Sequence, residues 1–410
     1  METIPGSQRI TVAAFTRLHE DGEVIVGRPE INAYLVVEPS AVEVLDWFAE
    51  GATVDEVRER YMERYGEPLE ILPFLERLES KGFVHREGAA GRPADILGAR
   101  SNQPTRFHLE WVTPQLARRL SSPVTVSLMV FLVLAGLVTL ASTPELVPSW
   151  RALYFPQGLG VYGSILLLTS LILVAIHELA HLVAARAAGV SCRFGIGTRL
   201  WIPVAETDMT GVWSIPRRKR YLPFLAGPLV DATGGSLVAL LLFAAGRSWI
   251  HLSAPATRFC QALLLIYLLA LLWQCYLFVR TDFYYVLANL LRCKSLMDDT
   301  GVFVRNALAP WLPGMTVRDQ SHLPHHEMSA VRWFSIAWLG GRFVAVGALL
   351  LIQLPLAWSY LVLLASAATA SGAAGRGAQG LVGTTILGLL VFATGLTMWL
   401  HRLFRRKPTS

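Results

Sequence analysis

Two histidines and a glutamate interrupt a stretch of sequence that otherwise has the composition of a membrane helix. Residues 177–181 read HELAH and lie within the apolar run of residues 161–190. Ionisable side chains in such a helix cost roughly 2 to 3 kcal/mol each unless something binds them. His177 and His181 are four positions apart, so their imidazoles share one helix face and can reach one metal ion. The pattern predicts a Zn²⁺ site, with Glu178 as the general base toward a metal-bound water.

The composition is that of a membrane protein with several spans. Of the 410 residues, 53% are hydrophobic and 16% are charged, whereas soluble domains have roughly 25% charged residues. We therefore expect a polytopic α-helical membrane protein with about six transmembrane helices, since a span takes ~20 apolar residues. The runs that meet this length are residues 124–141, 161–184, 222–245, 263–279 (extended back to about 256), 344–364 and 381–400. Residues 331–343, which contain two arginines and a Gly-Gly pair, are interpreted as an interfacial or re-entrant segment.

The basic residues indicate how the spans are oriented. With six helices, the clusters at residues 118–119, 217–220, 292–294 and 402–407 all fall on one side, and the positive-inside rule makes that side the cytoplasm. Both termini are then cytoplasmic in a multi-pass protein of the cell membrane. Orientation of the spans in the membrane accounts for the net charge of +6, so membrane lipid is an expected partner and no nucleic-acid partner is expected. Because the first apolar run begins beyond residue 120, no cleavable signal peptide is expected.

Cysteine usage favours structural thiols. Cys192, Cys260, Cys275 and Cys293 form no CxxC pair and lie mostly in or beside the spans. We expect them to be reduced, and a thiolate zinc site is not favoured.

Residues 1–87 have the pattern of a soluble α+β domain. Short alternating stretches predict strands at 10–14, 23–26 and 33–37, and three amphipathic helices follow at 41–49, 54–65 and 70–80. Ser40 and Thr53 are the expected N-caps, and Gly82 is expected to end the third helix before a short strand at 83–84. This order of elements predicts a winged-helix-like domain. Its acidic second helix argues against a DNA-binding face.

The segment VEPSAVEVLDWFAEGATVDEVRERYMERYG, followed by FLERLESKGFV, carries a more specific likeness. Across residues 22–86 it resembles the PqqD-like peptide-recognition domains, which bind the leader segment of ribosomally made, modified peptides. The resemblance implies that residues 1–87 bind a precursor peptide. Residues 88–120 then form a Gly/Pro/Ala-rich linker and a helix that approaches the membrane surface.

Two histidines leave a catalytic zinc one protein ligand short. The best candidate is Asp282, since it lies at the end of the fourth span, which runs in the same direction as the span that carries His177 and His181. The three side chains should therefore lie at similar depth. Asp231 is the rival ligand, and it can also be read as a buried acid that is hydrogen-bonded to a neighbouring helix.

Three motifs together resemble the site-2 protease superfamily, in particular the bacterial branch of peptide zinc metalloproteases. They are HELAH at 177–181, AGPLVD at 226–231 and TDFYY at 281–285, and the likeness extends over residues 107–296. It implies metal ligation by Asp282 and substrate contact by Gly227, Pro228 and Asp231. Phe283 departs from the family pattern, which has glycine at this position.

The sequence therefore predicts an intramembrane zinc endopeptidase with its protease core at residues 121–296, a cytoplasmic or interfacial segment at 297–343 and further helices at 344–410. The expected substrate is a peptide precursor that the N-terminal domain recognises, with an exporter or modifying enzymes as further partners. One alternative is regulated cleavage of a membrane-anchored regulator. Another is a non-catalytic partner in peptide binding or export.

Overall fold

The computed structural model describes most of the chain, in two compact units. The first unit comprises residues 1–118, 185–195 and 207–220, and the second comprises residues 119–184, 196–206 and 221–410. The predicted linker at 88–105, Lys294, His322 and the basic cluster at 402–407 lie outside the described residues. The described residues are 6–20, 22–28, 31, 33–86, 109, 111–153, 159–190, 192–293, 295–311, 315–321, 323–369, 386, 388–390 and 392–401.

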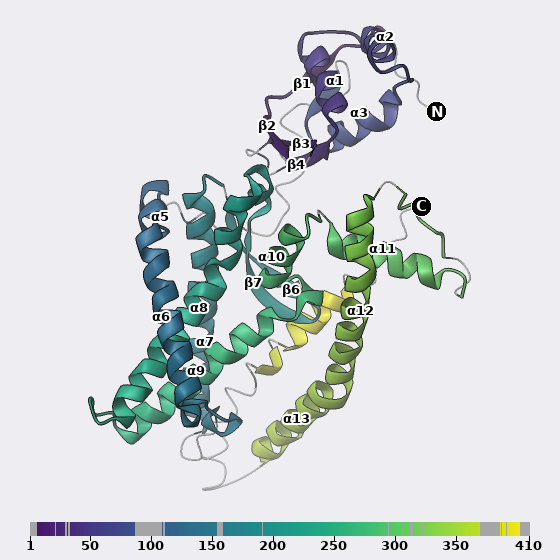
Figure 1. The fold of residues 1–410 in the computed structure, drawn as a ribbon. Coiled ribbons are helices and arrows are strands. Elements are labelled where there is room, and N and C mark those ends of the chain that lie inside the picture. The colour runs from purple at the N-terminus through teal and green to yellow at the C-terminus, as the bar shows by residue number, and fades with distance from the viewer. Residues whose placement is uncertain are drawn as a thin grey trace. The chain divides into compact units, whose positions relative to one another are not determined.

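The amino-terminal part of the first unit has five strands and three helices (Figure 1). Its elements are β1 (Ile10–Val12), β2 (Thr16–Glu20), β3 (Glu23–Arg28), β4 (Ala33–Val37), α1 (Pro39–Ala49), α2 (Val54–Tyr65), α3 (Ile71–Ser80) and β5 (Val84–Arg86). Strands β2, β3 and β4 form an antiparallel sheet in sequence order, and β1 pairs antiparallel with β5. One cluster of buried apolar side chains, from Ile10 to Val84, joins the strands to the three helices. This part therefore has a hydrophobic core of its own.

The predicted strands and helices of this part are confirmed, with two differences. The strand β2 was not predicted. Ser40 is not an N-cap, because α1 begins two residues earlier than predicted, at Pro39, whose fixed φ suits the first helical position. Thr53 does cap α2: its hydroxyl accepts the N–H of Glu56, and the Glu56 carboxylate accepts the N–H of Thr53 at 2.8 Å. Gly82 follows α3 with φ +76°, as its predicted role in ending the helix requires.

Five helices in the described residues are long and apolar enough to cross a membrane, so the chain is a membrane-embedded helical protein. The candidate spans are Pro114–Ser142, Tyr162–Ala187, Arg217–Gly246, Ala254–Gln274 and His325–Ser359. They contain α5 (Pro114–Leu120), α6 (Pro123–Ser142), α7 (Leu159–Ala187), α8 (Arg217–Gly246), α9 (Ala254–Gln274) and α12 (His325–Ala348). Many apolar side chains on these helices are exposed, as lipid contact requires.

The structure corrects two predicted boundaries. The fourth span ends at Gln274 and not at residue 279, because the chain turns through η5 (Leu277–Val279) and begins a new helix, α10 (Asp282–Leu290). Residues 331–343 form no re-entrant turn, since α12 continues through a π-helical turn, η6 (Leu349–Gln353), into α13 (Leu354–Thr369). The predicted sixth span at 381–400 lies partly outside the described residues, which contain a shorter apolar helix, Gly388–His401.

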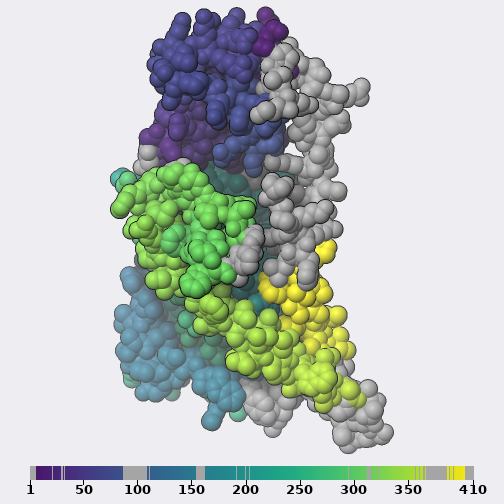
Figure 2. Space-filling model, turned by 90° about the vertical axis from the view of Figure 1, so that its right-hand side faces the viewer, coloured from purple at the N-terminus to yellow at the C-terminus, as the bar shows by residue number. Residues whose placement is uncertain are grey.

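Helix α11 (Leu296–Leu308) supports α10 in the second unit. It packs with α10 and α12 around Tyr284, Leu296 and Phe334, and the Tyr284 hydroxyl accepts the N–H of Met297 at 3.0 Å. This cluster fixes α10, whose first residue is Asp282. In Figure 2, α11, α12 and α13 lie at the surface of the unit. The remaining elements are η2 (Pro144–Leu146), η3 (Trp150–Leu153), η4 (Thr210–Ser214), β6 (Arg193–Arg199) and β7 (Ile202–Asp208), and the last two pair with each other between α7 and α8.

The four cysteines are free. Burial raises the pKa of the Cys192 thiol above its ordinary value and raises the pKa of Cys293 to about 12. Both groups are therefore neutral thiols near neutral pH, as expected for structural cysteines.

Candidate metal site

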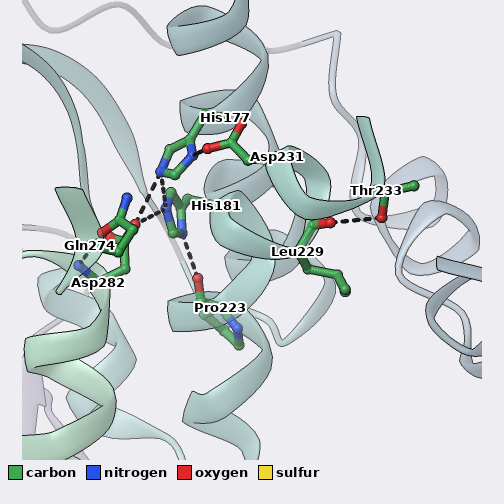
Figure 3. Close-up of polar contacts among 8 residues, drawn as sticks. All are labelled: His177, His181, Pro223, Leu229, Asp231, Thr233, Gln274 and Asp282. Atoms are coloured by element: carbon green, nitrogen blue, oxygen red, sulfur yellow. Dashed lines mark hydrogen bonds and ion pairs between the residues drawn. The ribbon is translucent and has the colours of Figure 1, made fainter. Parts of the chain in front are cut away.

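Helix α7 presents both histidines of the HELAH motif on one face. Their rings lie 4.9 Å apart in an edge-to-face arrangement, and both side chains are buried, His181 with 1% of its surface exposed. Their Nε2 atoms are 3.1 Å apart. The predicted pairing of positions i and i+4 is thus confirmed, with the two Nε2 atoms directed to one point (Figure 3).

Two groups on helix α8 are hydrogen-bonded to the Nδ1 atoms of His177 and His181, which lie across each ring from Nε2. The Nδ1 atom of His177 lies 2.6 Å from an Asp231 carboxylate oxygen, and the Nδ1 atom of His181 lies 2.7 Å from the backbone carbonyl oxygen of Pro223 (Figure 3). Asp231 is 4% exposed. Asp231 is therefore the buried acid hydrogen-bonded to a neighbouring helix, and it contacts His177 on the side away from His181.

The same helix needs a glycine where it passes the imidazoles. A Cβ atom at Gly227 would lie 2.4 Å from Nε2 of His181 and 2.5 Å from Nε2 of His177. Only a residue without a side chain fits, so the backbone of α8 closes one side of the cluster. Pro228 follows inside α8 and has no N–H to donate to the carbonyl of Phe224, which interrupts the helical hydrogen bonds beside the site.

Asp282, the first residue of α10, completes the cluster. One of its carboxylate oxygens lies 3.0 Å from Nε2 of His177 and 3.2 Å from Nε2 of His181. Burial raises the pKa of Asp282, but the two neighbouring imidazoles, when they are protonated, lower it more, so the pKa then lies below the ordinary carboxyl value. The expectation that Asp282 reaches the depth of the two histidines is confirmed.

The hydrogen bonds on the Nδ1 atoms determine what the Nε2 atoms can do. A carbonyl oxygen only accepts, so the Pro223 carbonyl places the proton of His181 on Nδ1, and the carboxylate of Asp231 does the same for His177. In the neutral rings both Nε2 atoms are then acceptors, and they face a third acceptor on Asp282. Three acceptors within 3.2 Å of one another require positive charge between them, either a proton or a metal ion.

The spacing of the three acceptors suits a metal ion of zinc's size. Ligand atoms about 2.0 to 2.1 Å from a tetrahedral centre are separated by about 3.3 Å. The separations here are 3.0, 3.1 and 3.2 Å, so small outward shifts would admit the ion. In metal sites a ligating histidine commonly donates its other N–H to a carboxylate or a carbonyl, as both rings do here. Within the described residues, His177, His181 and Asp282 form a group that could hold a metal.

The remaining predicted residues lie around this group. Glu178 is partly buried on α7, one residue after His177 and three before His181, a spacing that places it beside His181 on the helix surface. Asp208 accepts the backbone N–H of Thr210 at 3.1 Å and so has a structural role in a turn. His251, His325 and His326 are exposed.

Two contacts at the site were not foreseen from the sequence. The Pro223 carbonyl is a backbone group, and no residue type signals it. The side chain of Gln274 accepts the backbone N–H of Asp282 at 3.1 Å (Figure 3). A polar residue at the end of an apolar run was the available signal for Gln274.

Comparison of the chain with known protein families, with curated proteins and with solved structures gives no match. No activity is therefore assigned through a relative, and the chemistry of the site is inferred from its residues.

Proposed function

We propose that the chain is a membrane-embedded zinc endopeptidase whose metal ion is bound by His177, His181 and Asp282. The supporting observation is that Nε2 of His177, Nε2 of His181 and a carboxylate oxygen of Asp282 converge at separations of 3.0 to 3.2 Å, while both Nδ1 atoms are hydrogen-bonded to groups of α8.

The residues around the metal site have separate roles in the proposed reaction. Zinc, when bound, supplies a water of lowered pKa and polarises the carbonyl of the scissile bond. Glu178 accepts a proton from the attacking water and passes it to the leaving amine. Asp231 and the Pro223 carbonyl hold the two imidazoles in the tautomers that leave Nε2 free to bind. Gly227 keeps side-chain atoms out of the space that the reacting groups need.

The site belongs near the cytoplasmic face. It is built from the last third of α7, the first half of α8 and the start of α10. If each candidate span crosses the membrane, Arg118, the cluster at 217–220 and Arg292 all lie on the side of these helix ends. The positive-inside rule favours the cytoplasm for that side, and we expect the N-terminal domain on the same side.

The favoured substrate is the precursor of a ribosomally made, modified peptide, bound through its leader by residues 1–87. The support is the resemblance to PqqD-like domains and the antiparallel sheet of β2, β3 and β4, whose outer strands offer backbone groups for pairing with an extended peptide. Tethering the leader raises the effective concentration of the cleavage site at the zinc. An exporter or modifying enzymes would act on the same peptide.

The first experiment compares the native protein with Glu178→Gln in the cell membrane. The amide keeps the shape of the side chain but accepts no proton, so zinc should be retained and hydrolysis lost. Asp282→Ala should instead lose the metal. Mass spectrometry of new peptide termini in cells that produce each form would show the products. Identical termini in the native and Glu178→Gln strains would contradict the proposal.

A second experiment concerns the substrate. Deleting residues 1–87 should weaken cleavage of a full precursor at low concentration and leave cleavage of a leaderless substrate at high concentration intact. Undiminished cleavage of the full precursor, with no leader binding by residues 1–87, would favour cleavage of a membrane-anchored regulator instead. Neighbouring genes offer an independent check. A gene for a short precursor peptide beside genes for modifying enzymes would favour cleavage of a peptide precursor over cleavage of a membrane-anchored regulator.

A further inference from the structure

The end of α9 and the start of α10 are joined by two hydrogen bonds of one residue, Gln274. Its side-chain oxygen accepts the backbone N–H of Asp282 at 3.1 Å, and its backbone carbonyl accepts the hydroxyl of Thr281 at 2.7 Å. Gln274 is 6% exposed and Thr281 is also buried. Figure 3 shows the Gln274 side chain directly beside Asp282.

These two hydrogen bonds pair a backbone carbonyl and a backbone N–H group that have no partner within their own helices. The last carbonyls of a helix and the first N–H groups of the next have no partner within their own helices. Gln274 is the last residue of α9, and Asp282 is the first residue of α10. The preceding Thr281 does not cap α10 with its own side chain, because its hydroxyl is donated to Gln274. Gln274 therefore acts as the cap of α10 from another helix.

The connection needs such a restraint. Arg280 has φ +58°, a left-handed conformation that is uncommon for residues other than glycine. Without the bonds to Gln274, the residues before Asp282 could relax toward ordinary backbone angles. A carboxylate at the first position of a helix would move with them.

We infer that Gln274 is a positioning residue that holds the Asp282 carboxylate at the two histidines. This inference rests on the proposed metal site, because it assigns to Gln274 the orientation of the third ligand. The hydrogen bonds of Gln274 reach the hydroxyl of Thr281 and the backbone N–H of Asp282, not the three ligand atoms. Its effect reaches the site through the backbone N–H of Asp282, and it should be seen in metal affinity and geometry.

The test uses the full chain with Gln274→Met, which keeps the length of the side chain and removes the acceptor. Zinc affinity, measured by competition with a chelator, should fall about 10- to 100-fold, the usual effect of losing a partner that orients a ligand. The visible spectrum of the Co²⁺-substituted protein should change as well, because it reports ligand geometry. Gln274→Glu retains an acceptor oxygen and should restore affinity and spectrum.

Two further variants keep the test decisive. Gln353→Met removes a comparable bond, in which the Gln353 side chain accepts the indole N–H of Trp201 at 2.7 Å in the same unit, and it should leave zinc affinity unchanged. Thr281→Val loosens the same connection and should weaken zinc binding even if Gln274→Met fails to fold. If Gln274→Met folds and binds zinc with wild-type affinity, Gln274 does not position Asp282, although the zinc site itself is not contradicted. If Gln274→Met does not fold, wild-type zinc affinity in Thr281→Val has the same meaning. A native protein that binds no zinc would overturn both the role of Gln274 and the zinc site.

Discussion

Replacing Gly227 by alanine tests the metal site with the smallest change that the chain allows. The added methyl group would lie 2.4 Å from Nε2 of His181 and 2.5 Å from Nε2 of His177. Atoms that are not bonded normally stay about 3.5 Å apart, so the imidazoles or α8 must move by roughly 1 Å. Metal–ligand distances tolerate only about 0.2 Å. We expect zinc affinity to fall about 100-fold, which corresponds to about 2.7 kcal/mol.

The same substitution should act differently on the fold. Alanine is favoured over glycine in a helix interior by about 0.8 to 1 kcal/mol, and Gly227 lies inside α8. This gain offsets part of the cost of the overlap in the metal-free protein, so its thermal stability should fall less than its zinc affinity. Gly246→Ala is the matched control, because a Cβ atom there meets nothing within 4 Å at the other end of the same helix.

The assay is the zinc content of purified protein, followed by chelator competition and a thermal melt of the metal-free form. Gly227→Ala should lose zinc while Gly246→Ala keeps it. If Gly227→Ala binds zinc as the native protein does, the metal does not lie among the three ligand atoms described here. Equal losses of zinc and of stability in Gly227→Ala would instead indicate misfolding of α8.

Three other predictions concern the site and the N-terminal domain. The native protein should hold about one zinc per chain, and the double change His177→Ala and His181→Ala should abolish it; unchanged zinc by elemental analysis would remove the site. Asp231→Asn should keep zinc with about tenfold weaker affinity, since the uncharged amide makes His177 a poorer ligand, whereas complete loss would make Asp231 a ligand. The hydrogen bond from the backbone N–H of Thr53 lowers the pKa of the Glu56 carboxyl below its ordinary value of 4.5. The ionised carboxylate therefore stabilises the folded domain above pH 4.5, and this stabilisation is lost as the pH falls through the pKa of Glu56 in the folded protein. Glu56→Gln should flatten this dependence in thermal melts of the N-terminal domain, and an unaltered profile would contradict it.

Much of the fold could be predicted because local signals agree with the tertiary structure. Thr53 with Glu56 three residues later marks the start of α2, and the pattern of Val54, Val57 and Tyr61 gives its buried face. The strand β2 was missed because its residues, Thr16–Glu20, are mostly polar and only partly buried, and they form a strand by pairing with β3. No local property of the segment carries that information.

The site was predictable only where residue type and spacing carry the chemistry. His177 and His181 follow from helix periodicity, and Asp282 follows from the direction of the spans. The roles of Gly227 and Gln274 depend on how closely α8 and α10 approach α7, and hydropathy does not encode these distances. The end of the fourth span was misplaced for a related reason, since residues 275–279 are apolar enough to continue a helix, yet the chain turns there to bring Asp282 back to the histidines.

The structure also bears on Phe283, the one residue of the third motif that departs from the pattern of site-2 proteases. A glycine would be needed there if the backbone had a positive φ or if another group approached too closely for a side chain. Residue 283 has neither requirement as the second residue of α10: its φ is not positive, and its side chain is partly buried. The left-handed residue in this connection is Arg280, two positions before Asp282. Phenylalanine at 283 is therefore compatible with a helical start that directs Asp282 toward the imidazoles, and the departure from glycine is no argument against Asp282 as the third ligand.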